Sequence, residues 1–224
     1  MFTPLITHDL DGAALAAPVN AARCNGAAYK TRTIDDLHIK DDRLRAAIEG
    51  TGHLLFDGGM GTMLQAAGLK LGARPEELNI TDPQLIEGIH AQYAAAGSRI
   101  INANTFGASA HKLAGSVYSL EEIIAAGIAN CKRACAPYGA LAALDVGPLG
   151  ELLEPNGTLA FEDAVEEYAR IVRAGAAAGA DLIFFETFTD LYELKAALLA
   201  ARENSSLPIL ASMSFEAGGR TFTG

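Results

Sequence analysis

The sequence predicts an α/β fold of the (β/α) barrel class, in which parallel strands alternate with helices. Five apolar runs are predicted strands: 53–57, 99–103, 140–145, 181–185 and 208–214. Strands that are apolar almost throughout are buried on both faces, which is typical of a parallel sheet covered by helices. A polar residue closes each of the first four: Asp57, Asn104, Asp145 and Glu186. Barrel strands gather their carboxyl ends at one face, so we expect these side chains to converge there.

Other interpretations of the same pattern stay open. A doubly wound sheet would concentrate its site at one switch point rather than at successive strand ends. Taken singly, a polar residue after a strand is more often a helix cap or a turn former than a functional group. Four such residues in the same position of successive units favour the barrel.

Composition limits the function classes. The chain has 224 residues, 50% of them hydrophobic, and 23 glycines, enough for one sizeable core in one domain or part of a larger one. The net charge of -10 disfavours nucleic acid or an anionic membrane as the main partner. We find no signal segment and no apolar run near the ~20 residues of a membrane span, so a cytoplasmic location is expected.

The chain before the first strand is predicted to form two parts. Residues 1–40 mix prolines, glycines and scattered charges without a sustained period, which indicates a loosely ordered extension. Residues 41–50 then form a short helix that begins with acids, ends at Gly50 and covers the bottom of the following domain. We therefore expect a barrel domain over residues 41–224.

The first strand runs into a glycine-rich loop, and a helix follows from Met63. Backbone freedom at Gly58, Gly59 and Gly61 lets the loop turn sharply and direct several N–H groups at one anion, a carboxylate or a phosphate. A dinucleotide fingerprint is disfavoured because Leu64 occupies the place of its third glycine. A plain strand-to-helix turn remains the simpler alternative.

The remaining helices have recognisable ends. Asp82 and Pro83 begin one that closes at Gly97, and Ser119 with Glu122 forms a capping box for a helix that reaches Pro137. Further helices are expected over residues 161–179 and 190–203, the last one capped by Asp190 and Glu193.

Five motifs carry a family resemblance: 56–62 (FDGGMGT), 74–80 (RPEELNI), 102–108 (NANTFGA), 145–151 (DVGPLGE) and 185–188 (FETF). In this order they resemble the homocysteine-binding domain of cobalamin-dependent methionine synthase, over residues 51 to 224. Homocysteine S-methyltransferases and betaine–homocysteine methyltransferase share the barrel with looser motifs. The run from Pro75 to Ile80 favours the methionine synthase branch.

The resemblance implies a site for the substrate amino acid. Backbone N–H groups from Gly58 to Thr62, including those of Gly59 and Gly61, would hold the carboxylate of homocysteine. Asp57 and Glu186 would hold its ammonium group. Asn104 and Thr105 would line the same pocket, with Asp145 as a possible further member.

The resemblance also implies cofactors. The thiol of homocysteine, with a pKa near ~8.5, is mostly protonated at neutral pH, and in the family a Zn²⁺ held by three cysteines activates it. The methyl group comes from methylcobalamin on a separate domain, ultimately from methyltetrahydrofolate, and the product is methionine. The expected partners are homocysteine, the remaining barrel strands and the folate and cobalamin domains of a parent protein.

The zinc cysteines of the family belong to the sixth and eighth β units, whereas this sequence shows five. Residues 51 to 224 number 224 − 51 + 1 = 174, against the ~250 of a full barrel. We therefore expect a barrel truncated after about five units, without metal ligands and inactive alone. Cys131 and Cys135 are expected to be buried helix residues and not zinc ligands, and Cys24 lies outside the resemblance. His90 and His111 are expected to be solvated or satisfied locally.

Two classes of function follow. The chain is either the homocysteine-binding part of a zinc- and cobalamin-dependent methyltransferase, or a non-catalytic, metal-free fragment that at most binds an amino acid. A cobalamin-independent homocysteine S-methyltransferase is a further alternative within the first class. The methyl donor, the oligomeric state, the role of residues 1–40 and whether the protein naturally ends at Gly224 are not predicted.

Overall fold

The computed structural model describes residues 34–70 and 72–224. Most of the extension predicted for residues 1–40 lies outside the described residues, and the domain boundary near residue 40 stays a prediction. Within the described part, a short 3-10 helix η1 (Ile34–Leu37) precedes α1 (Asp42–Ile48), and Ile39 between them is buried. The Asp41 carboxylate caps α1, as the acids at the start of this helix predict.

Four parallel strands form the sheet: β1 (Ile100–Asn102), β2 (Leu141–Val146), β3 (Leu182–Phe188) and β4 (Ile209–Met213). Their order in space is their order in the chain, β1-β2-β3-β4. Each strand therefore pairs with the next one through a helical crossover, and all carboxyl ends point the same way. This arrangement confirms the predicted parallel sheet.

The prediction of a regular strand at 53–57 is wrong. This segment makes a single parallel bridge, between Phe56 and Ile100. The Leu55 carbonyl accepts the N–H groups of Arg99 and Ile100, and the Asp57 N–H donates to the Ile100 carbonyl. The segment thus lies beside β1 in the predicted place, but its apolar residues are not buried: 59% of the Leu55 surface is exposed.

Helices lie before β1 and between the successive strands. They are α2 (Met60–Ala66), η2 (Pro75–Glu77), α3 (Leu78–Thr81), α4 (Pro83–Ala95), α5 (Leu120–Cys135), η3 (Ala136–Tyr138), α6 (Phe161–Ala177) and α7 (Leu191–Asn204). The predicted capping box of Ser119 and Glu122 begins α5, and Asp82 and Asp190 cap α4 and α7. Glu193 does not cap α7, because its carboxylate accepts hydrogen bonds from the Leu149 N–H and the Tyr168 hydroxyl instead.

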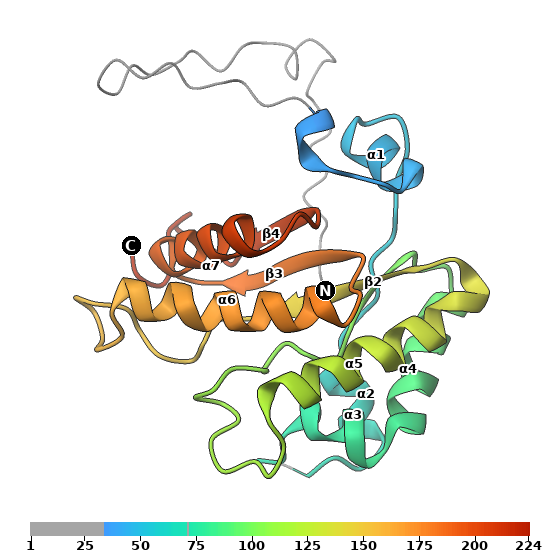
Figure 1. The fold of residues 1–224 in the computed structure, drawn as a ribbon, viewed down its shortest axis with the longest axis horizontal. Helices are drawn as coiled ribbons and strands as arrows, with labels where there is room; N and C mark the ends of the chain where they lie inside the picture. The colour runs from blue at the N-terminus through green and yellow to red at the C-terminus, as the bar shows by residue number, and fades with distance from the viewer. Residues whose placement is uncertain (1–33, 71) are drawn as a thin grey trace. The chain divides into compact units, whose positions relative to one another are not determined.

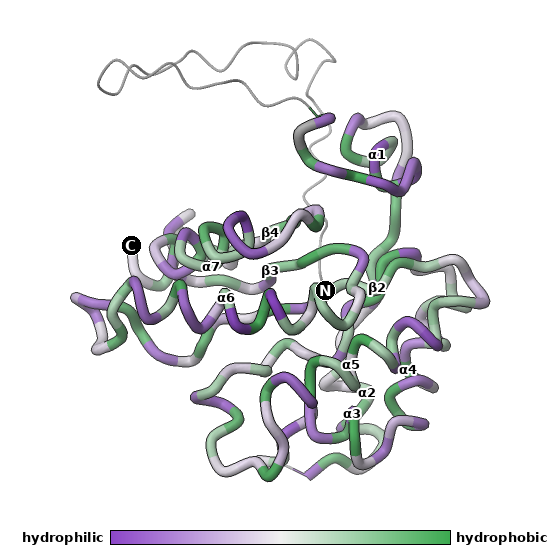
Figure 2. The backbone as a smooth tube through the Cα atoms, viewed as in Figure 1, coloured by the Kyte–Doolittle hydropathy of each residue, from purple (hydrophilic) through white to green (hydrophobic). Residues whose placement is uncertain are grey.

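The two faces of the sheet have different cover. One face packs on the helices, and its core includes Ile101, Leu144 and Ile183 together with buried residues of α5, α6 and α7. Figure 1 shows α4, α5, α6 and α7 following one another along this side, and Figure 2 shows hydrophilic residues recurring between hydrophobic ones along α6 and α7. None of the described helices is both long and apolar enough to cross a membrane.

The other face, called the inner face below, carries Ile100, Ala143 and Leu182, which pack with Ile39 and Leu44. Side chains alternate along a strand, so Asn102, Asp145 and Glu186 belong to the same face, two to four residues nearer the carboxyl ends. The inner face is thus apolar at the bottom and polar at the top.

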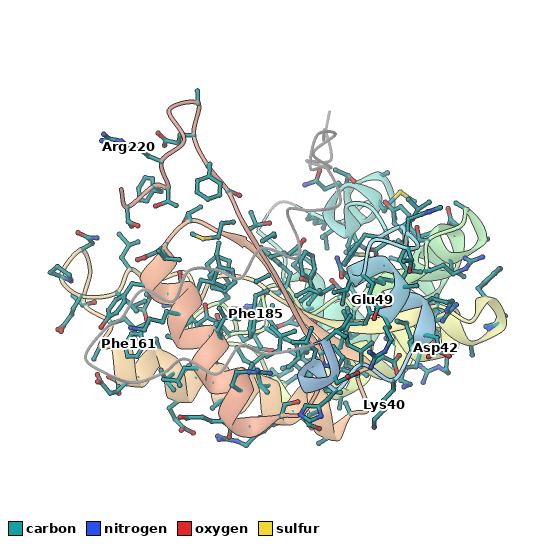
Figure 3. The ribbon with its side chains drawn as sticks, turned by 90° about the horizontal axis from the view of Figure 1, so that it is seen from above. Lys40, Asp42, Glu49, Phe161, Phe185 and Arg220 are labelled. Carbon is teal, nitrogen blue, oxygen red and sulfur yellow. The ribbon has the colours of Figure 1, made fainter. Side chains whose placement is uncertain are left out.

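A β-bulge interrupts β3 next to Glu186. Phe185 pairs with Ala211 but Phe188 pairs with Met213, so β3 contains one more residue than β4 over this stretch. Thr187 adopts a left-handed backbone conformation (φ 61°), and its N–H donates to the Ser212 hydroxyl. The bulge lets Phe185 and Phe188 both enter the helix-covered core, with ring centroids 5.9 Å apart (Figure 3 labels Phe185 there), while Glu186 stays on the inner face.

Candidate functional site

Three acids converge at the carboxyl ends of the strands: Asp57 after the bridged segment, Asp145 in β2 and Glu186 in β3. The carboxyl groups of Asp145 and Glu186 influence each other's pKa, and the charge of Asp57 acts on Asp145. We call these three residues the carboxyl cluster. The structure therefore brings together three of the four strand-end residues that the sequence singles out.

Asp57 is held by backbone. Its Oδ2 accepts the N–H of Asn102 at 3.0 Å, whereas its Oδ1 is buried and has no donor among the described residues. Burial raises the pKa of Asp57 to about 7, and the charge of Glu186 adds to this rise. Backbone N–H groups oppose it without cancelling it. The Asp57 carboxyl group thus changes its charge near neutral pH.

Asp145 is the most enclosed member, with 5% of its surface exposed. Burial raises its pKa well above the usual range, and the negative charges of Glu186, Asp57 and Glu76 raise it further. Burial also raises the pKa of Glu186, where the hydrogen bond from Asp145 acts in the opposite direction. Two neighbouring acids whose pKa values are both raised by burial favour a state in which one of them is protonated.

Unpaired oxygen atoms mark this end of the inner face. Oδ1 of Asp57, Oδ1 of Asn102 and Oδ1 of Asp145 are buried acceptors for which the described residues offer no donor. Buried polar atoms without partners are rare, because each costs about 1–3 kcal/mol. An ammonium group brings three N–H donors and a positive charge, which makes it the complementary ligand.

The glycine-rich loop begins α2, as predicted, although the helix starts at Met60 rather than Met63. Gly59 is the N-cap residue and offers no side chain, so the first N–H groups of the helix lack a capping acceptor. The Tyr93 hydroxyl donates to the Gly59 carbonyl at 3.3 Å. A side chain at Gly58 would place its Cβ 2.9 Å from that hydroxyl oxygen, so a larger residue there would displace the Tyr93 ring. Thr62 bonds the Gly59 carbonyl as well, at 3.0 Å.

Asn104 and Thr105 are buried, and their observed hydrogen bonds go to the protein itself. The Asn104 amide donates to the Pro75 carbonyl at 2.8 Å and to the Asn79 Oδ1 at 3.0 Å. The Thr105 hydroxyl donates to the Asp145 carbonyl. These bonds hold the 75–79 segment and the end of β2 in place, which is a positioning role. Their direct contact with a ligand stays a prediction.

Sequence reasoning missed two charged residues beside the cluster. Glu76 is buried, accepts the Gly107 N–H at 2.8 Å, and has a pKa raised by burial. Lys112 donates to the Pro148 carbonyl at 2.7 Å and lies 5.0 Å from the Phe106 ring centroid. The charges of Glu76 and Asp145 raise the pKa of Lys112, which burial lowers. Glu76 belongs to the motif at 74–80, which was a signal for it; Lys112 had none.

The comparison with protein families matches residues 54–224 to the sequence model described as homocysteine S-methyltransferase. The chain belongs to the homocysteine S-methyltransferase family. The match begins at the segment beside β1 and includes the whole carboxyl cluster.

Similar proteins of this family agree in sequence and fold. A methionine synthase from Mycobacterium tuberculosis is 30% identical over 212 residues, which cover 86% of this chain and 17% of that protein. The homocysteine methyltransferase MmuM from Escherichia coli, in its metallated form, superposes with a TM-score of 0.69 at 20% identity, over 80% of this chain and 69% of that one. The oxidized form gives 0.67 at 23% identity, over 78% and 66%. These matches confirm the TIM-barrel-like fold class; the chain spans about one sixth of the length of the methionine synthase.

Family membership raises the question of zinc. The described residues contain no group of three or more His, Cys, Asp or Glu side chains arranged to hold a metal ion. Cys131 and Cys135 are buried in α5 with their sulfur atoms 3.8 Å apart, and the Cys131 thiol lies 3.5 Å from the Ile101 carbonyl. Burial and the neighbouring sulfur raise the pKa of Cys131 well above its usual value, so it stays a thiol. These residues do not fit a zinc site.

His90 and His111 differ in their burial. His111 is exposed and lies 3.4 Å from Glu151, so it is solvated and satisfied locally, as expected. The same prediction is wrong for His90, which is fully buried in α4 and has no hydrogen-bond partner for either ring nitrogen among the described residues. Burial lowers its pKa to about 4, so the ring is neutral at pH 7.

Proposed function

We propose that this chain is the homocysteine-binding part of a methyltransferase of the methionine synthase type. The carboxyl cluster binds the ammonium group of homocysteine, and the backbone N–H groups of Gly58–Thr62 bind its carboxylate. The observation that carries this proposal is the set of three buried acceptor oxygens without donors, on Asp57, Asn102 and Asp145. Family membership supports the choice of amino acid.

The proposed site offers negative charge to one end of the ligand and N–H donors to the other end. The cluster offers negative charge in a place shielded from water, where an ammonium group gains more than at the surface. The loop at Gly59 offers unpaired N–H groups at the start of α2, where a helix favours an anion. An α-amino acid carries both charges on neighbouring atoms, so one small ligand satisfies both.

The cofactors of the reaction belong to a longer protein in this proposal. The relative from Mycobacterium tuberculosis extends far beyond the match, which supports a multidomain parent whose other domains bind cobalamin and folate. Because the described residues do not fit zinc, we assign no step of methyl transfer to it in this chain. Buried, unpaired thiols at Cys131 and Cys135 agree with a cytoplasmic location.

Isothermal titration of the chain with L-homocysteine tests the proposal. Glu186→Gln should weaken binding by about 10- to 150-fold, since one charged hydrogen bond contributes about 1.5–3 kcal/mol. The matched control is Glu203→Gln, which makes the same change on the exposed side of α7 and should bind as the natural chain does. The 2-hydroxy analogue of homocysteine, which lacks the ammonium group, should not compete. Equal affinity of Glu186→Gln and the control contradicts the assigned role of Glu186.

A second candidate is binding without methyl transfer by the chain itself. The described residues contain no set of side chains that could hold zinc, and this favours binding without methyl transfer over catalysis by the chain alone. An assay of methionine formation with methylcobalamin, and in parallel with a sulfonium methyl donor, separates the candidates. Methionine formed from the sulfonium donor alone would assign the chain to the cobalamin-independent branch.

A further inference from the structure

Asp145 is placed where a carboxylate is hardest to keep charged. It is 5% exposed, its Oδ1 finds no donor among the described residues, and Glu186 follows on the same face of the neighbouring strand β3. Thr105 bonds only its backbone, through the carbonyl and the N–H, and leaves the side chain untouched. The geometry therefore places a second acid beside a buried carboxyl group that lacks a donor, and a proton on one of the two relieves their repulsion.

The charged groups around Asp145 come from four parts of the chain. Asp57 lies after the segment bridged to β1, Glu76 in η2, and Glu186 in β3, and each contributes negative charge. Lys112, in the loop before α5, feels the negative charges of Asp145, Glu76 and, in α7, Glu193, which raise its pKa against the lowering effect of burial. One ammonium group shared among these acids leaves negative charge in excess, which favours a neutral Asp145.

We propose that Asp145 holds a proton in the free protein, shares it with Glu186, and releases it to solvent when the ammonium group of an amino acid enters the pocket. This inference rests on the proposed function and adds a proton to its binding step. The O–H bond of Asp145 breaks, the proton passes to the buffer, and N–H donors of the ligand replace it at the carboxylate oxygens. Asp145 is a binding residue in this scheme, and its protonated form interacts with Glu186 until the ligand arrives.

Burial and the surrounding acids support this assignment, since both raise the pKa of Asp145. The arriving positive charge has the opposite effect and lowers it. The free pocket then binds more protons than the occupied one, so affinity should increase with pH. A binding step that releases one proton becomes about tenfold tighter per pH unit.

Titration calorimetry in two buffers measures the released proton directly. The probe is L-methionine, because its thioether has no proton to lose, so any proton released comes from the protein or from the probe's amino group. At about pH 7.5, the binding enthalpy of the natural chain should differ between phosphate and Tris, two buffers with different ionisation enthalpies. Asp145→Asn should bind methionine and release about one proton fewer, whereas Glu203→Gln should match the natural chain.

The outcomes separate this inference from the proposed function. Binding by the natural chain with equal enthalpies in both buffers overturns the released proton and leaves the amino-acid pocket intact. Unchanged proton release by Asp145→Asn overturns its assignment to Asp145. Failure of the natural chain to bind either methionine or homocysteine overturns the proposed function, and this inference with it.

Infrared spectroscopy keeps the inference testable if Asp145→Asn does not fold. The ligand-free natural chain should show the carbonyl stretch of a protonated carboxylic acid at about pH 8, above the pKa of Asp57, and methionine should remove it. Glu186→Gln, in which the amide can donate to Asp145, should lack the band. A natural chain without this band in the absence of ligand contradicts the proposal.

Discussion

Thr105 and Asp145 hydrogen-bond each other twice through one hydroxyl group. The Thr105 Oγ1 donates to the Asp145 carbonyl at 2.8 Å and accepts the Asp145 N–H at 3.2 Å. The pair joins the chain after β1 to the carboxyl end of β2, 40 residues away, and thereby fixes the height of the Asp145 side chain in the pocket.

Thr105→Val should measure how much the two hydrogen bonds of the Thr105 hydroxyl contribute to stability. Valine has the same shape but leaves a buried carbonyl and a buried N–H unpaired, so the free energy of unfolding should fall by about 2–4 kcal/mol. Urea unfolding measures the change. Thr105→Ser, which keeps the hydroxyl and loses one methyl group, should lose clearly less. Equal losses in the two variants would mean that packing and not hydrogen bonding sets the role of Thr105.

Thr187→Asn should stabilise the protein. Thr187 is exposed and holds a left-handed backbone conformation that costs a β-branched residue about 1–2 kcal/mol, whereas asparagine adopts it readily. We expect the free energy of unfolding to rise by about 1 kcal/mol. The matched control, Thr158→Asn, makes the same change at an exposed site with ordinary backbone angles and should have no comparable effect. A destabilised Thr187→Asn variant would show that the Thr187 side chain supports the bulge.

His90 should make the protein acid-sensitive. Its pKa is about 4 when folded, below the value of about 6.5 expected when unfolded. The unfolded chain therefore binds the extra proton first, and stability from this group is present above about pH 6.5 and is lost as pH falls towards 4. From pH 7.5 to 5 the free energy of unfolding of the natural chain should fall by about 2 kcal/mol relative to that of His90→Leu, as measured by urea unfolding at both pH values. Parallel pH profiles of the two proteins would contradict the burial of a neutral His90.

Asp57 should make the protein less stable as the pH rises, opposite to the effect of His90. Its pKa is raised to about 7 in the folded state, so the folded protein binds the proton more tightly than the unfolded chain does. Stability from this group is present below about pH 4 and is lost as pH rises through 7. Between pH 5 and 7.5, the free energy of unfolding of Asp57→Asn should therefore rise by about 2 kcal/mol relative to that of the natural chain. Glu203→Gln, which alters an exposed acid, should show no such gain; a constant difference between Asp57→Asn and the natural chain would argue against a buried, protonated Asp57.

Zinc should not bind this chain tightly through Cys131 and Cys135. Both thiols are buried in α5, where the described residues supply no third ligand arranged for a metal. After equilibration with Zn²⁺ and dialysis, metal analysis should find far less than one zinc per chain. The double variant Cys131→Ala, Cys135→Ala should give the same value. One tightly held zinc that disappears in the double variant would overturn this expectation.

Several features of the fold could be predicted from the sequence because they depend on near neighbours. A capping box needs only Ser119 and Glu122, three residues apart, and both hydrogen bonds form. The apolar runs that became β1 to β4 predicted parallel strands in chain order. The polar residue at each strand end predicted a shared site, and Asp57, Asp145 and Glu186 do converge.

Only the tertiary structure decided how these elements meet. The bulge at Thr187 depends on the register between β3 and β4, and no pattern within β3 alone determines it. Glu193 was expected to cap α7, but its carboxylate accepts from Leu149, 44 residues earlier, and from Tyr168. Local sequence cannot rank such distant partners, because each depends on where a whole helix packs.

The same reason separates the residues of the site. The position of Asp145 at a strand end could be predicted from an apolar run that closes in an acid. Its state could not, since the raised pKa of Asp145 arises from the burial and the charges that packing brings together, including Glu76 from 69 positions earlier. The sequence by itself determined which residues stand at the carboxyl ends of the strands; the folded sheet decided which of them touch, and with that which of them carries a charge.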